Sequence, residues 1–135
     1  TFGLSYRDTD SAAGPFVLPT SSPVQFEPAP LRQSIQRLLA TQPRQMYLTH
    51  FGAVGDVPRL ADLLLAQVDA MVALATALRD APQRHAALKA GLQAQARERL
   101  QQHGVADLHS ALASLALDIE LNAQGLGVWL DRATR

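Results

Sequence analysis

The chain has 135 residues, which is enough for one domain with a hydrophobic core and too few for two domains of typical size. Its 12 basic and 12 acidic residues cancel and are interspersed, so we expect no nucleic-acid partner and no polybasic membrane patch. The absence of cysteine excludes disulfides, a thiol nucleophile and a thiolate metal site.

The opening segment TFGLSYR carries apolar side chains at alternate positions, which predicts a short strand. N-termini are usually polar and loosely held, whereas this chain begins at Thr1 directly in an apolar stretch. We therefore expect the segment to continue from an upstream part of a larger domain.

Residues 8–30 hold too many prolines for a regular helix or strand. A structureless stretch of this length is unusual inside a compact domain, and it is typically a functional loop or a segment resting on another part of the protein. We expect an extended loop that docks through four apolar residues, namely Phe16, Val17, Leu18 and Phe26.

A helix and then a strand are predicted next. The apolar residues between Leu31 and Leu39 recur on one face of an amphipathic helix, predicted over about residues 31–41 and ended by Pro43. The apolar run that follows predicts a short strand over about residues 46–49. A helix that leads into a strand is half of a βαβ crossover, the unit that extends an α/β sheet.

From Asp56 onward the sequence predicts three helices of a bundle. Asp56 is expected to cap the first of them, whose apolar stripe is too wide for a single neighbouring helix. The second restarts after Pro82 and ends at His103 and Gly104, where the glycine suits the helix end and the histidine suits the negative end of the dipole.

Asp107 is expected to cap the third helix, whose apolar residues keep the four-three spacing of a bundle seam. Asn122 is the polar member of this seam. It either fixes the register at a cost in stability or lies at the wet edge with Leu121 covering the core, and we favour the wet edge. Gly125 and Gly127 each cost about 1 kcal/mol relative to Ala. Because the apolar spacing resumes beyond them, we expect the helix to continue, with close packing or a bend.

His50 is the candidate for site chemistry, because it follows the predicted strand directly. One interpretation is a solvated or hydrogen-bonded loop histidine, and the other is a metal ligand whose partners are missing from this chain. The other histidines, His85, His103 and His109, have no ligand spacing with one another. We expect His85 and His109 to be solvated.

The run MYLTHFG, preceded by SIQRLLATQP and followed by DVPRLADLLLAQ, resembles the C-terminal part of the metallo-β-lactamase-fold hydrolases. In that superfamily a late helix leads into a strand whose last residue is the final histidine ligand of the metal pair, often in an (L/T)H(Y/F/G) step. The opening TFGLSYR is similar to the segment that follows the family's bridging aspartate. The resemblance covers residues 1–60 well, whereas the HxHxDH signature, a further histidine and the aspartate are absent from this sequence.

The resemblance implies that His50 is a ligand of a divalent metal, usually zinc. In the full-length parent, two such ions would activate a bridging water that hydrolyses a small-molecule substrate. Catalytic zinc needs about three protein ligands. We therefore expect this chain to be inactive by itself and to bind divalent metal weakly or not at all.

The predicted fold is mainly α with a small α/β part. It comprises a partial metallo-β-lactamase (αββα) C-terminal segment at residues 1–55 and a three-helix bundle-like extension at residues 56–135. The alternative function is a helical dimerisation or protein-interaction module without catalytic activity.

We expect a homodimer, because the large apolar residues of the first 55 positions would otherwise face water where the missing half of the domain packs. No stretch approaches the roughly 20 continuous apolar residues of a membrane span, and no signal-peptide pattern opens the chain. We therefore expect a cytoplasmic protein without a membrane partner.

Overall fold

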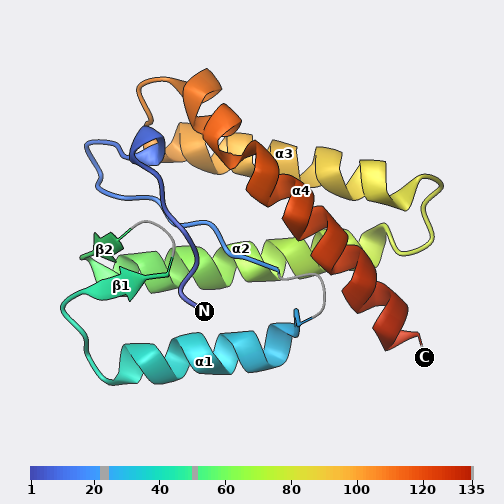
Figure 1. Cartoon of the computed structure of the whole chain (residues 1–135), viewed down its shortest axis with the longest axis horizontal. Helices are drawn as coiled ribbons and strands as arrows, with labels where there is room; N and C mark the ends of the chain where they lie inside the picture. The colour runs from blue at the N-terminus through green and yellow to red at the C-terminus, as the bar shows by residue number, and fades with distance from the viewer. Residues whose placement is uncertain (22–24, 50–51, 135) are drawn as a thin grey trace.

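A computed structural model describes residues 1–21, 25–49 and 52–134 of the chain (Figure 1). Within these residues the fold is mainly helical, because 64% of them lie in helix and the remaining regular structure is one small two-stranded antiparallel sheet. The mainly α prediction is therefore confirmed. The elements in chain order are the 3-10 turn η1 (Arg7–Thr9), α1 (Pro28–Ala40), β1 (Met46–Leu48), β2 (Gly52–Val54), α2 (Val57–Ala77), α3 (Arg84–His103) and α4 (Leu108–Ala133).

Helix α2 is the central element. Its N-terminal half packs into a core that includes Phe2, Ile35 and Leu48 from the first 55 residues. Its C-terminal half packs into a second core formed mainly by α3 and α4. The apolar stripe of α2 is wide because the helix serves both cores, and Leu63 contacts each of them. Figure 1 shows the same arrangement, with α1 on one side of α2 and the crossed pair α3 and α4 on the other.

The helix-then-strand prediction is confirmed with shifted ends. Helix α1 begins at Pro28, three residues before the predicted start, because proline fits the first turn, where the N–H it lacks has no helical partner. Strand β1 pairs antiparallel with β2, so that Leu48 lies opposite Gly52. Strand β2 was not predicted from the sequence, since Val54 is the one buried residue of its three. Within the described residues the unit is therefore a short hairpin and not half of a parallel crossover.

The three helices predicted after residue 56 form as expected, but their caps differ. Asp107 caps α4 as predicted, and its Oδ1 accepts the Ser110 N–H at 3.0 Å. Asp56 occupies the N-cap position of α2 in the left-handed conformation, with φ 50°, and accepts no capping bond. Its carboxylate pairs with Arg59 instead. The side-chain cap predicted for Asp56 is therefore wrong.

Helix α4 continues through both glycines, as predicted, and Gly125 supplies the close packing. A Cβ built at Gly125 would lie 2.2 Å from the carbonyl oxygen of Ser21. A Cβ at Gly127 would meet nothing nearer than an Arg84 nitrogen at 4.0 Å. Gly125 therefore lets the N-terminal segment, defined here as residues 1–21, lie directly against the helix.

The N-terminal segment is held across the helices and is not a strand of a sheet. Leu4 and Leu18 exchange backbone hydrogen bonds of 3.0 and 2.9 Å, which make one isolated bridge. The predicted strand over TFGLSYR is therefore reduced to a single bridge. The predicted docking of the proline-rich stretch is confirmed, because its four anchoring residues are all buried, namely Phe16, Val17, Leu18 and Phe26.

Polar side chains from the helices satisfy the backbone of this segment. Gln67 of α2 donates to the Val17 carbonyl at 2.8 Å. Asn122 of α4 donates to the Pro19 carbonyl at 2.9 Å and accepts the Ser21 N–H at 2.8 Å. Buried backbone groups need such partners when no sheet supplies them. An irregular segment can therefore lie in the interior of this protein.

The wet-edge interpretation of Asn122 is wrong. Its side chain is only 3% exposed, and Leu121, expected to cover the core, is 40% exposed. The helix presents Asn122 inward because the N-terminal segment, and not water, supplies its hydrogen-bond partners. The four-three spacing identified the buried face of α4 correctly, but it did not reveal the backbone groups to which Asn122 is hydrogen-bonded.

The expected exposure of the first 55 residues is also wrong for most of the apolar residues concerned. Phe2, Leu4, Phe16 and Leu48 are buried against the helices of the same chain. Tyr47 is the exception and is 81% exposed. The apolar patch from which a homodimer was predicted is therefore largely covered within one chain.

Helix α2 is also the one helix among the described residues that is long and apolar enough to cross a membrane, with a mean hydropathy of 1.6 in its most apolar window. A core helix passes the same test. Because α2 contributes to both cores, its apolar composition has an explanation in the packing of this chain.

Candidate functional site

The predicted metal ligand His50 lies outside the described residues. On the described sides of it, β1 ends at Leu48 and β2 begins at Gly52. Leu48 is buried, and Thr49 is exposed. The described residues contain no group of three or more His, Asp or Glu side chains that could hold a metal ion.

The three other histidines occupy separate places. His103 ends α3, and its Nε2 lies 2.9 Å from the Gly14 carbonyl oxygen, which makes Nε2 the protonated nitrogen. Its ring also contacts Phe16, with ring centroids 5.6 Å apart. His103 therefore helps to hold the N-terminal segment, in addition to lying at the helix end as predicted. His109 is exposed, in line with its expected solvation.

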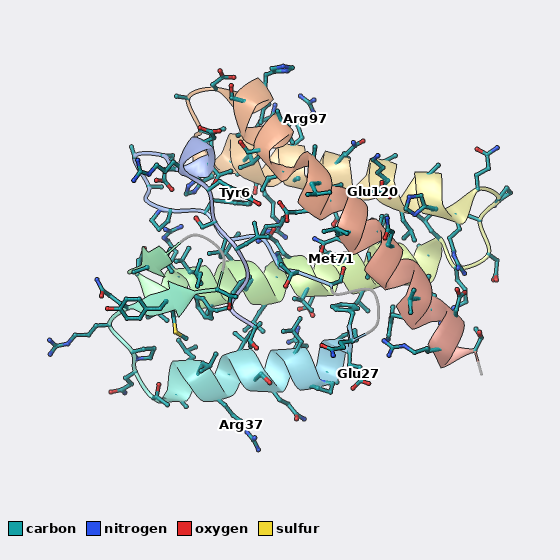
Figure 2. The ribbon with its side chains drawn as sticks, in the orientation of Figure 1. Tyr6, Glu27, Arg37, Met71, Arg97 and Glu120 are labelled. Carbon is teal, nitrogen blue, oxygen red and sulfur yellow. The ribbon has the colours of Figure 1, made fainter. Side chains whose placement is uncertain are left out.

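His85 is half exposed and belongs to a small charged cluster between α3 and α4. Its Nε2 lies 3.0 Å from one carboxylate oxygen of Glu120, and Lys89 Nζ lies 3.0 Å from the other. The hydrogen bond from Gln124, followed by the one from Lys89, lowers the pKa of Glu120 to about 2. Figure 2 shows Glu120 on the side of α4 that faces α3. The simple solvation predicted for His85 is therefore incomplete, since it has an acidic partner.

A groove lies beside this cluster, between the connection from α2 to α3 and the C-terminal half of α4. It encloses about 650 Å³. Arg79, Arg84 and His85 line it on one side, and Asp131 of α4 lines it on the other. Its floor is apolar and includes Leu88, which is fully buried.

The local fold explains the shape of this groove. The chain leaves α2 at Leu78 and enters α3 at Arg84 after Gln83, which adopts the left-handed conformation with φ 52° and makes no side-chain cap. Arg84 then reaches across to α4 and pairs with Asp131 at 2.7 Å. Gly127 adds no side chain on the opposite wall. The groove is therefore the space left between a tight corner and a glycine-bearing helix.

Sequence reasoning did not find this groove. It used the break near Pro82 only to end one helix and begin another, and it left Arg79, Arg84 and Asp131 unassigned. The available signal was weak: two arginines flank the break, and the acidic partner of one of them lies far along the chain.

Comparison with known families, with curated proteins and with solved structures found no match for this chain.

Proposed function

We propose that this chain is the C-terminal portion of a metal-dependent hydrolase of the metallo-β-lactamase superfamily, with His50 as one metal ligand. The observation that carries the proposal is the order of elements ahead of that residue. Helix α1 (Pro28–Ala40) leads into β1 (Met46–Leu48), and β1 ends two residues before His50. The resemblance that rests on MYLTHFG calls for this order.

The proposed chemistry requires more than this chain contributes. In the parent protein, two divalent ions, usually zinc, would lower the pKa of a bridging water, so that a hydroxide attacks the substrate near neutral pH. A catalytic zinc ion takes about three protein ligands, and His50 supplies one. His50 is the one residue of this chain that the resemblance assigns as a ligand, so the chain alone is proposed to be inactive.

The proposal is tested in the protein that carries the remaining ligands. His50→Ala should lower bound metal, measured by atomic emission, and hydrolytic activity together. His109→Ala is the matched control, because His109 is exposed and should change neither quantity. An unchanged metal content in His50→Ala would remove His50 from the site.

A second measurement uses the chain alone. Calorimetric titration of the 135-residue chain with zinc should give weak or undetectable binding, because one imidazole leaves most of the coordination shell to water. Tight binding of one or more zinc ions per chain would contradict the proposal that the ligand set is incomplete.

The second candidate is a helical interaction module that forms a homodimer. It is favoured by Leu117 and Leu121, which are 68% and 40% exposed and lie one turn apart on α4. Both side chains are exposed to solvent, so a second copy could reach this face without unfolding. Burial of two leucines contributes only a few kcal/mol, roughly 1.5–3 each, which limits the dimer to weak association.

Light scattering from 1 to 100 micromolar (roughly the range in which weak dimers form) tests this candidate. The mass should rise with concentration, and Leu117→Glu should keep the chain monomeric. Leu38→Glu on α1 is the control, because Leu38 is the comparably exposed leucine of another helix. A constant monomer mass for the unaltered chain would exclude a dimer through α4.

A further inference from the structure

The groove between the α2–α3 corner and α4 contains a cationic group without a protein partner. The Nε atom of Arg79 is buried and makes no hydrogen bond in the part of the chain that the structure describes. Leaving a buried donor of a charged group unpaired is costly. Arg79 lines the groove, so a ligand in the groove is within reach of its guanidinium.

Within the described residues, none of the acidic groups near the groove is paired with Arg79. Arg84 is already committed to Asp131 at 2.7 Å and to the Arg79 carbonyl at 3.5 Å. His85 is committed to Glu120. Asp80, the other acidic residue of the lining, is exposed at the rim. Asp131 has its own cationic partner, so within the described residues neither acid is paired with Arg79.

Helix α3 adds a second attraction for negative charge. It is 20 residues long, it begins at this groove with Arg84, and no side chain caps its N-terminus. The first amides of a helix lack internal partners, and the positive end of the dipole lies there. The Arg79 guanidinium, which has no acidic partner among the described residues, and the uncapped helix end therefore favour an anion at the same corner.

Apolar residues make up much of the remaining lining. Leu88 and Ala123 lie fully buried beneath it, and Ala81 and Val128 are partly exposed. A bare inorganic ion would leave Ala81 and Val128 in water, whereas a short hydrocarbon body would cover them. The groove, at about 650 Å³, is large enough for such a ligand.

We propose that this groove binds a small organic monocarboxylate, with its carboxylate on the Arg79 guanidinium and its hydrocarbon body over Ala81 and Val128. A carboxylate matches the planar guanidinium in geometry. A phosphate dianion fits less well, because Asp80 and Asp131 would repel its second charge. The site is separate from the metal chemistry proposed for His50 and does not depend on it.

Titration of the 135-residue chain with hexanoate, followed by the amide shifts of Arg84, His85 and Val128 in ¹H–¹⁵N spectra, tests the proposal. The shifts should saturate with a dissociation constant of about 1 mM, as expected for a ligand of this size. Inorganic phosphate and hexan-1-ol are the comparison probes, and both should bind about tenfold more weakly. Absence of saturable shifts with hexanoate would overturn the proposal. Phosphate binding as tight as that of hexanoate would overturn the assignment to a carboxylate.

Arg79→Gln tests the contact itself and should weaken hexanoate binding by about tenfold, the lower end for a hydrogen bond to a charged group. Arg79→Lys keeps the charge without the buried Nε and should also weaken binding. Arg37→Gln is the matched control, since Figure 2 shows Arg37 projecting from α1 away from the other helices. Unchanged hexanoate affinity in a folded Arg79→Gln chain would refute the assignment. The titration of the unaltered chain decides the matter if both Arg79 variants fail to fold.

Discussion

Two glycines on α4, two residues apart, should respond in opposite ways to replacement by alanine. In a helix interior, alanine is more favourable than glycine by about 1 kcal/mol, because glycine loses more backbone freedom on folding. At Gly127 the new methyl group has space, since the nearest heavy atom would lie 4.0 Å away. We therefore expect Gly127→Ala to raise the free energy of unfolding by about 1 kcal/mol.

At Gly125 the same methyl group has no space. It would lie 2.2 Å from the Ser21 carbonyl oxygen and 2.9 Å from the Ser21 carbonyl carbon, and these are backbone atoms that cannot turn aside. Relief requires the N-terminal segment to move away, which strains the hydrogen bonds of 2.8 and 2.9 Å between Ser21 and Asn122. Overpacking of a core costs about 1–3 kcal/mol, and each weakened hydrogen bond costs about 1 kcal/mol more. After the gain in helix propensity, we expect Gly125→Ala to be destabilised by about 2–4 kcal/mol.

Urea unfolding followed by circular dichroism at 222 nm measures both variants against the unaltered chain. The unfolding midpoint of Gly125→Ala should fall by about 1–2 M and that of Gly127→Ala should rise by about 0.5 M, for a slope typical of a small domain. Equal slopes are needed for this comparison to report stability. If Gly125→Ala proves as stable as Gly127→Ala, the N-terminal segment does not lie against α4 as described, and the packing argument fails.

Further predictions concern the same helix. Asn122→Leu should lower the free energy of unfolding by about 3 kcal/mol, because the buried backbone groups that Asn122 bonds would lose their partners. Leu121→Ser, at an exposed neighbouring position, should change the free energy of unfolding by less than about 0.5 kcal/mol. If urea unfolding shows little loss of stability in Asn122→Leu, or a large loss in Leu121→Ser, Asn122 does not point inward as described. The pKa of Glu120 falls from 4.5 to about 2 on folding, chiefly through Gln124 and then Lys89, so its contribution to stability is present above pH 4.5 and is lost as the pH falls towards 2. Unfolding measured across this range should show a shallower loss in Glu120→Gln than in the unaltered chain, and parallel curves would exclude the effect.

Helices were the part of the fold that sequence periodicity predicted well. The apolar spacing in α2, α3 and α4 is a local property of the chain, and it identifies the buried face whichever element covers that face. The same reasoning failed for Asn122, because its partners are backbone groups of Ser21 and Pro19, about a hundred residues away in the chain. No local pattern shows that an irregular segment will lie against a helix.

The N-terminal half was harder to predict for a related reason. Proline-rich stretches signal the absence of regular structure but not the place where the segment rests. The docking residues of this stretch, Phe16, Val17 and Leu18, were found because large apolar side chains in a loop need a surface to cover them. Their surface was taken to be a missing half of the domain. The structure places it on α2, α3 and α4 of the same chain.

The two candidate sites differ in how far apart their residues lie in the sequence. His50 was found from a local run of residues and a resemblance, and it lies outside the described residues. The groove at Arg79 depends on Asp131 and Val128, which follow about fifty residues later, and on the glycine that leaves space at α4. Such a site emerges only from packing, so sequence reasoning had no means to assign it.

The two parts into which the sequence was divided, residues 1–55 and 56–135, share their hydrophobic cores. Phe2 and Leu48 pack with the first turns of α2, and Phe16 and Phe26 pack with α3 and α4. Gln67 and Asn122 satisfy buried backbone of the first part from helices of the second. Removing either part would therefore expose both apolar surface and unpaired polar groups of the other. The helices and the N-terminal segment that crosses them therefore stabilise one another.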